Sequence, residues 1–246
     1  MTNLQEKKAL VTGGNSGIGY AAAKELKAQG AEVIITGRRA DAVQKAAAEL
    51  GVTGLVADQG QLAAIEKLAN EVSKKYGKID ILFINAGVLE MTMIENATEQ
   101  NFDNIINVNF KGAYFTLSKF IPLLNEGASV VFLSSNTANM SGANSSIYSS
   151  SKAAINSLMK IAAIELAPRK IRVNSVSPGP TQTEIMKKVG FSETQLQEVN
   201  NWMIDQIPLK KIGTAEDVAK MVAYFSGDAA SFITGAEIIM DGGMSL

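Results

Sequence analysis

Short apolar segments alternate with longer amphipathic segments along this chain. The apolar segments predict strands at residues 7–12, 31–37, 52–57, 79–84, 129–134, 171–177 and 236–240. The amphipathic segments between them predict helices at residues 18–29, 40–50, 61–76, 98–124, 147–167 and 215–226. Strands that are apolar along their whole length are typical of a parallel sheet covered by helices on both faces. The pattern therefore predicts a doubly wound α/β fold.

No break in this alternation marks a domain boundary, so we expect residues 1–246 to form a single domain. The one long segment outside the alternation is 178–213, and we interpret its part at about 183–211 as a substrate flap. A pair of surface helices packed on the core is the alternative. As a flap, this segment would favour a medium-sized, partly apolar substrate because of its apolar side chains. These are Ile185, Met186, Phe191, Trp202, Met203 and Ile204.

Composition removes several classes of function. The chain has no cysteine and no histidine, which excludes disulfides, thiolate nucleophiles, Ser-His-Asp hydrolysis and metal sites built on these residues. We therefore predict no metal site. With 23 basic and 24 acidic residues, the overall charge attracts neither nucleic acid nor an anionic membrane. The polar amino terminus and the lack of a long apolar stretch predict a cytoplasmic protein.

A glycine-rich turn lies between the first predicted strand and the first predicted helix, where the pyrophosphate of a dinucleotide would meet a helix amino terminus. Glycine lets backbone N–H groups approach phosphate oxygens closely. A tight turn alone would also need glycines, so this motif is weak by itself. The candidate phosphate-binding residues are Gly13, Asn15, Ser16, Gly17, Ile18 and Gly19.

The residues after the second strand distinguish between two dinucleotides. A carboxylate there usually holds the adenosine ribose 2′-hydroxyl, whereas a 2′-phosphate needs cations. This chain has Arg38 and Arg39 at that place, so NADP(H) is favoured over NAD(H). The alternative is that both arginines are solvated turn residues. Asp58 follows the third strand and either accepts a hydrogen bond from the adenine amino group or caps the next helix.

These motifs and those after them resemble the short-chain dehydrogenase/reductase family, in particular its compact members such as 3-oxoacyl-carrier-protein reductases and carbonyl reductases. The resemblance covers nearly the whole chain and implies a Rossmann-type, mostly parallel sheet of seven strands. Ile84 departs from it, since many relatives have asparagine there. The matching residues are Thr12 to Gly19, Asn85-Ala86-Gly87, Asn109, Ser135, Tyr148-x-x-x-Lys152, Pro178-Gly179 and Asp241-Gly242-Gly243.

The residue types fit hydride-transfer chemistry. Tyr148 and Lys152 lie four residues apart, so a helix would project them from one face. A nearby ammonium favours the phenolate and should lower the pKa of Tyr148, which would then act as acid or base. Ser135 ends a core strand, where ligands of open α/β sheets bind, and would hold the substrate oxygen. Ser134 is the less favoured of the two serines.

Further roles follow only from the resemblance. It implies that Lys152 binds the nicotinamide ribose, that Asn109 holds a water for proton return, and that the loop after residue 178 lies at the nicotinamide. It also implies a homotetramer. The remaining cofactor contacts expected on this basis are Asp58, Gln59, Asn85, Ala86, Gly87, Pro178, Gly179, Thr181 and Thr183.

The predicted activity is NADP(H)-dependent hydride transfer at a carbonyl or alcohol carbon of a small molecule, and three alternatives stay open. A dinucleotide-sensing or scaffold protein would share the fold without turnover. Hydride chemistry could also serve epimerisation or act on a carrier-bound acyl group. Such a carrier would favour a basic patch; the candidates are Lys187, Lys188, Lys210 and Lys211. No motif identifies the substrate, its stereochemistry or the direction of reaction.

Overall fold

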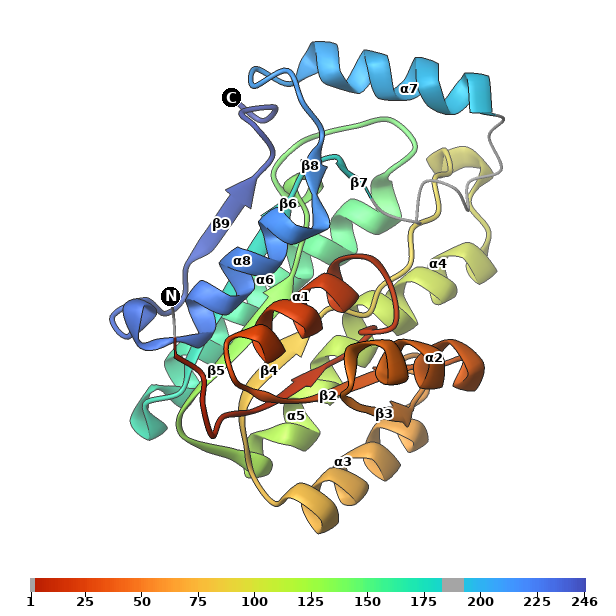
Figure 1. Ribbon diagram of the computed structural model, residues 1–246. Coiled ribbons are helices and arrows are strands. Elements are labelled where there is room, and N and C mark those ends of the chain that lie inside the picture. Colours follow the sequence, from red (N-terminus) through yellow and green to blue (C-terminus); the bar gives the residue numbers. More distant parts are fainter. Residues whose placement is uncertain (1–2, 183–192) are drawn as a thin grey trace.

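A computed structural model describes residues 3–182 and 193–246 of the chain, and it shows one central sheet of seven parallel strands (Figure 1). The strand order is β3-β2-β1-β4-β5-β6-β9, which confirms the predicted doubly wound α/β fold. The strands are β1 (Lys8–Val11), β2 (Glu32–Gly37), β3 (Thr53–Val56), β4 (Ile79–Ile84), β5 (Leu124–Leu133), β6 (Arg172–Pro178) and β9 (Glu237–Met240).

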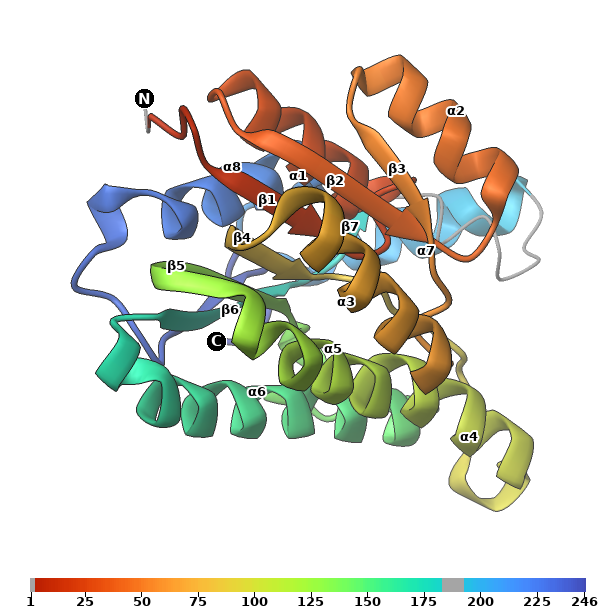
Figure 2. The ribbon, with the colours of Figure 1, turned by 90° about the horizontal axis from the view of Figure 1, so that it is seen from below.

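Helices cover both faces of the sheet, as Figure 2 shows from below. One face is covered by α1 (Gly17–Ala28), α2 (Ala40–Leu50) and α8 (Ala215–Ser226). The opposite face is covered by α3 (Leu62–Tyr76), α5 (Ala113–Phe120) and α6 (Ser146–Leu166). Successive strand residues supply the two layers: Val130 packs in one core and Val131 in the other. This double burial explains why the strands read as continuous apolar runs.

The segment 98–124 is the main correction to the predicted elements. The expected long helix is divided into α4 (Glu99–Ile106), a π-helical turn (Asn107–Gly112) and α5, followed by a short 3₁₀ turn with Pro122 in its first turn. Strand β5 begins at Leu124 rather than at Ser129. Exposed Glu126 and Gly127 interrupt the apolar pattern there, and the pairing of β4 with β5 shifts register between Ile79 and Ile81.

The elements β7 (Thr181–Gln182), α7 (Glu193–Gln206) and β8 (Gly213–Thr214), which follow β6 in the chain, lie over the carboxyl end of the sheet. Strand β7 pairs in parallel with β8, and α7 lies above them (Figure 1). The first part of the predicted flap, residues 183–192, lies outside the described residues. Within α7, Trp202 is 60% exposed, so this ring does not pack into the core. None of the helices in the described ranges is long and apolar enough to cross a membrane.

Candidate active site

The glycine-rich turn joins β1 to α1 at the carboxyl edge of the sheet. Gly13 and Gly17 have φ angles of 65° and 53°, a region that side chains with a Cβ rarely adopt. Ser16 precedes α1, and its side chain forms no capping hydrogen bond with the described residues. The first N–H groups of the helix therefore need another acceptor, and the positive end of the helix dipole favours an anionic one.

The underside of this turn is held by the residues that follow β4. Asn85 Nδ2 donates hydrogen bonds to the carbonyl oxygens of Thr12 (2.8 Å) and Gly13 (3.2 Å). Thr12 Oγ1 in turn accepts from the backbone N–H groups of Asn85 (3.0 Å) and Ala86 (3.1 Å). A Cβ on Gly19 would lie 2.3 Å from the Gly13 oxygen, so Gly19 permits close packing behind the turn. Thr12 was part of the motif, but its bridging role was not predicted.

A pocket extends from this turn to the amino-terminal part of α6. It brings together most of the predicted cofactor-binding residues, namely Gly13, Asn15, Ser16, Gly17, Ile18, Arg38, Arg39, Asp58, Gln59, Asn85, Ala86, Gly87, Tyr148 and Lys152. Other lining residues were not assigned from the sequence: Thr36, Gly37, Ala57, Val88, Val108 and Leu133. All but Val88 and Val108 lie at or next to strand ends, a signal that could have identified them.

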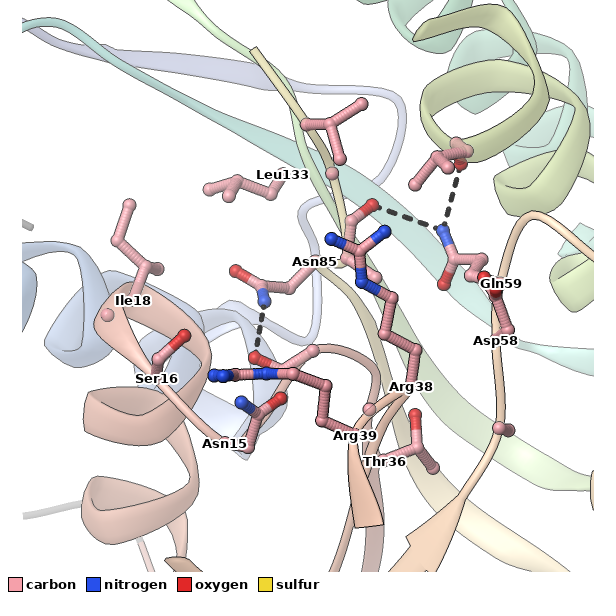
Figure 3. A pocket seen from close by; sticks show the side chains of 18 of the residues that line it. Asn15, Ser16, Ile18, Thr36, Arg38, Arg39, Asp58, Gln59, Asn85 and Leu133 are labelled. Carbon is pink, nitrogen blue, oxygen red and sulfur yellow. Dashed lines mark hydrogen bonds between the residues drawn. The ribbon is translucent and has the colours of Figure 1, made fainter. Parts of the chain in front are cut away.

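The two arginines lie at one end of this pocket. Figure 3 shows Arg38 and Arg39 extending from the end of β2 in different directions. Both side chains are exposed, which leaves their guanidinium groups free to reach a ligand. Asn15 lies against the strand end, since a Cβ on Gly37 would be 2.3 Å from Asn15 Oδ1. The pocket thus has a positively charged end close to the glycine-rich turn.

Asp58 and Gln59 form the neighbouring wall. The alternative in which Asp58 caps the next helix is wrong, because α3 starts at Leu62 with Gln61 as its N-cap residue. Asp58 Oδ1 instead accepts a hydrogen bond from the Gly60 N–H (2.9 Å). Gln59 Nε2 donates to the carbonyl oxygens of Ala86 (3.1 Å) and Val108 (3.3 Å), the two dashed lines on the right of Figure 3.

Tyr148 and Lys152 lie at the opposite end of the pocket, both on α6 as the spacing predicts. Lys152 Nζ lies 5.7 Å from the centre of the Tyr148 ring. The lysine side chain is 4% exposed, and its Nζ donates a hydrogen bond to the Leu133 carbonyl oxygen at 2.8 Å. A buried cation is therefore fixed beside a phenol at the place where β5 ends.

The two candidate serines have different surroundings. Ser134 Oγ donates to the Lys152 carbonyl oxygen (3.2 Å), a contact that joins β5 to α6. Ser135 Oγ accepts from the N–H and the hydroxyl of Thr137, at 3.3 and 3.0 Å. The Ser135 side chain is also close enough to the Tyr148 phenol to lower its pKa. Ser135 therefore lies on the tyrosine side, in keeping with the preference drawn from the sequence.

Asn109 lies in the π-helical turn, behind the pocket wall. Its Oδ1 accepts from the Val88 N–H (2.8 Å) and its Nδ2 donates to the Val88 carbonyl oxygen (2.9 Å). The same Nδ2 lies 3.3 Å from Ser151 Oγ on α6. A Cβ on Gly87 would be 3.3 Å from Asn109 Oδ1 and 3.7 Å from Lys152 Nζ. Asn109 thus connects the loop after β4 with the helix that carries Lys152.

The loop after β6 lies apart from the pocket lining. Gly179 packs on the carboxyl-terminal segment, because a Cβ there would lie 2.5 Å from Asp241 Cβ. Thr181 Oγ1 donates to the Gly179 carbonyl oxygen at 3.0 Å and belongs to β7. Pro178 is buried at the end of β6, and Thr183 lies outside the described residues. The structure therefore does not bring Pro178, Gly179 or Thr181 to the pocket wall.

The environment of the candidate acid differs from the expectation. Burial raises the pKa of the Tyr148 phenol, and the neighbouring Ser135 side chain lowers it by less, so the net direction is upward. The sequence predicted a lowered pKa for Tyr148. Burial also lowers the pKa of Lys152 to about 8. Burial of the site thus favours the neutral phenol of Tyr148 and makes the Lys152 ammonium easier to deprotonate.

The family profile and the relatives that match this chain are all described as reductases or oxidoreductases. A family profile described as enoyl-(acyl carrier protein) reductase matches residues 13–245. Versicolorin reductase of Emericella nidulans is 33% identical over 98% of this chain and 96% of its own length. An oxidoreductase of Methylorubrum extorquens is 35% identical over 99% of this chain and 100% of that protein.

Solved structures agree along the whole length. A short-chain dehydrogenase/reductase of Brucella melitensis, of the glucose/ribitol dehydrogenase type, has a TM-score of 0.93 at 28% identity. The superposition covers 99% of this chain and 98% of the Brucella chain. A Serratia marcescens short-chain dehydrogenase/reductase variant has a TM-score of 0.91 at 31% identity and covers 99% of both chains.

Proposed function

Because the chain belongs to the short-chain dehydrogenase/reductase family, whose members use a nicotinamide cofactor, we propose that it is an NADP(H)-dependent oxidoreductase that interconverts a carbonyl and an alcohol. Tyr148 is the proposed acid and base. One observation carries this proposal: a single pocket has Arg38 and Arg39 at one end and Tyr148 with Lys152 at the other.

The residues at the first end fit a phosphorylated dinucleotide. The turn around Gly13 and Gly17 supplies backbone N–H groups for the pyrophosphate. The two arginines supply charge for a 2′-phosphate, whereas the pocket's carboxylate, Asp58, follows β3 rather than β2. This placement supports NADP(H) over NAD(H), because a carboxylate after the second strand is what holds a free 2′-hydroxyl. Asp58 can instead accept a hydrogen bond from the adenine amino group.

The residues at the other end account for the proton. The bound dinucleotide would supply or accept the hydride. Tyr148 holds the proton that the substrate oxygen gains on reduction, and a neutral phenol, as burial favours, is the form needed to donate it. Ser135 lies beside the Tyr148 phenol and can hold the same oxygen. Lys152 places a cation beside the ring that forms the phenolate and can bind a ribose hydroxyl.

Asn109 has a supporting place in this scheme. It fixes Val88 and touches Ser151, so it holds the wall next to Lys152 Nζ in position. We propose that protons return to Lys152 from solvent past this residue. Asn109→Leu should therefore lower the steady-state rate more than the affinity for NADPH.

The direct test is the oxidation of NADPH, followed at 340 nm, with ketones, aldehydes, sugars and acetoacetyl thioesters. Turnover that is lost in Tyr148→Phe while NADPH affinity stays within about twofold supports the proposal. Tyr114→Phe is the matched control, since this exposed tyrosine lies away from the pocket. Tight NADPH binding without turnover on any substrate would instead identify a dinucleotide-sensing protein.

A further inference from the structure

Glu237 of the last strand makes an unusual set of contacts with the active-site elements. Its Oε1 accepts hydrogen bonds from Asn139 Nδ2 (2.7 Å), Asn156 Nδ2 (2.8 Å) and Ser177 Oγ (2.6 Å). Three donors thus converge on one carboxylate oxygen. Such charge-assisted hydrogen bonds are stronger than those between neutral groups.

Each donor belongs to an element that carries part of the candidate site. Asn139 ends the short 3₁₀ turn that follows Ser135. Asn156 lies one helical turn beyond Lys152 on α6. Ser177 lies in β6 and is fully buried. Through a single oxygen atom, Glu237 therefore joins residues 135–139, which we call the serine loop, to helix α6 and strand β6.

The orientation of the Asn156 amide follows from its partners. Asn156 Oδ1 accepts from Ser175 Oγ at 3.1 Å, so Nδ2 is the atom that faces Glu237. Ser175 and Ser177 both lie in β6, whose residue Ser175 pairs with Glu237 in the sheet. The contact thus rests on regular strand pairing rather than on a loop, which is the kind of support that fixes a side chain precisely.

A second carboxylate holds the other end of the serine loop. Asn136 Nδ2 lies 3.4 Å from Asp241 Oδ2. Asp241 is 8% exposed and also accepts from the N–H groups of Gly243 and Ser245, both at 2.9 Å. Glu237 and Asp241 therefore bind the two asparagines that flank the turn after Ser135.

We propose that Glu237 is a positioning residue, which sets the distance between Ser135 and Tyr148 by anchoring the serine loop to α6. This inference rests on the proposed function for its catalytic consequence. Glu237 lines no part of the cofactor pocket, so it acts through the residues that it holds. A small displacement of a reacting group can cost about a hundredfold in rate, so the effect should appear in kcat.

The test compares variants at residue 237 with a matched variant at the amino end of the central strand β4. Glu237→Leu leaves three donors unpaired, whereas Glu237→Gln keeps an oxygen acceptor. Asp80→Leu is the control, because Asp80 accepts comparable hydrogen bonds from Lys8 N and Asn125 Nδ2, each at 2.9 Å. Asn139→Ala is a milder variant that removes only the exposed contact between Glu237 and the serine loop.

Two readouts are measured: kcat with the KM for NADPH, and hydrogen exchange of the peptide covering residues 134–141. We expect Glu237→Leu to lower kcat by about ten- to a hundredfold with KM for NADPH changed less than about threefold. Asn139→Ala should act in the same direction with a smaller effect, and Glu237→Gln should restore most of the rate. Exchange in 134–141 should rise in Glu237→Leu and stay at the wild-type level in Asp80→Leu.

The outcomes separate this inference from the proposed function. Failure of the wild-type protein to turn over any substrate contradicts the proposed function, and the exchange of residues 134–141 then decides whether Glu237 holds the loop. A kcat for Glu237→Leu and Asn139→Ala equal to that of Asp80→Leu overturns the positioning role. So does unchanged exchange of the peptide 134–141 in Glu237→Leu.

Discussion

Lys152 shows at the residue scale how burial changes what a side chain can do. From the sequence its ammonium should lower the pKa of Tyr148, yet in the structure the pKa of Lys152 itself falls to about 8 because the group is buried. The folded protein therefore binds this proton more weakly than the unfolded chain does. Burial of the protonated Lys152 side chain therefore lowers the free energy of unfolding.

This cost predicts a pH dependence of stability. Between pH 8 and the ordinary lysine pKa the unfolded chain binds more protons at residue 152, so the unfolding free energy of the wild-type protein rises with pH in that window. Lys152→Met lacks this contribution. Urea unfolding at pH 8 and pH 10 should show a wild-type increase larger than that of the variant by about 2 kcal/mol. Equal increases would contradict the burial of a charged lysine.

The arginines predict a change of cofactor preference. Arg38→Ala combined with Arg39→Ala should lower kcat/KM for NADPH by about ten- to a hundredfold and leave that for NADH within about threefold, because only NADPH carries the 2′-phosphate. Lys45→Ala on α2 is the matched control, since that lysine is exposed and pairs with Glu49. An equal loss of kcat/KM with NADPH and NADH would mean that the arginines do not bind the 2′-phosphate.

At the scale of elements, the turn between β1 and α1 depends on close packing. A Cβ on Gly19 would lie 2.3 Å from the Gly13 oxygen and 2.5 Å from Asn85 Nδ2. Gly19→Ala should therefore displace the turn and weaken NADPH binding by at least about tenfold, measured by the fluorescence of the bound cofactor. Gly142→Ala is the control, because its Cβ would meet Ser145 Oγ at 3.5 Å. Equal affinities in the two variants would contradict this role of Gly19.

Elements with strong periodicity could be predicted from the sequence. Helices α2 and α8 match the predicted ranges 40–50 and 215–226, and β4 matches 79–84. The division of 98–124 could not be predicted, because the π-helical turn is fixed by the contact of Asn109 with Val88 across the structure. The early start of β5 was hidden by the exposed residues around Gly127.

The candidate site was also predictable in part. The motifs predicted that Tyr148, Lys152 and the glycine-rich turn belong to one site, and in the structure they line one pocket. The contribution of Glu237 could not be found in this way, because it depends on which residues of β6 and α6 face the last strand. Thr12 is similar, since its hydroxyl matters through two backbone groups more than seventy residues away.

At the scale of the whole molecule, the pocket joins segments from both halves of the sheet. Its walls come from β2, β5, α1 and α6 and from the segments that follow β1, β3 and β4, which supports our proposal that residues 1–246 act as one domain. A ligand that binds these walls together binds only the folded state. NADPH should therefore raise the unfolding free energy, by about 4 kcal/mol at a thousand times its Kd.

The difference between the two cofactors makes this prediction specific. At equal concentrations NADPH should raise the melting temperature more than NADH, and the difference should vanish when Arg38 and Arg39 are both replaced by alanine. Thermal unfolding followed by circular dichroism measures both effects. A larger shift with NADH than with NADPH would reverse the proposed cofactor preference.

We propose that NADPH bound in this pocket transfers a hydride to a carbonyl carbon of the substrate. The most direct measurement uses NADPH deuterated at the transferring position of the nicotinamide, with mass spectrometry of the product formed by the wild-type protein and by Tyr148→Phe. We predict an alcohol that carries deuterium on the former carbonyl carbon, formed by the wild-type protein and not by the variant. An alcohol without deuterium would exclude hydride transfer from NADPH, and equal product from both proteins would exclude Tyr148 as the acid.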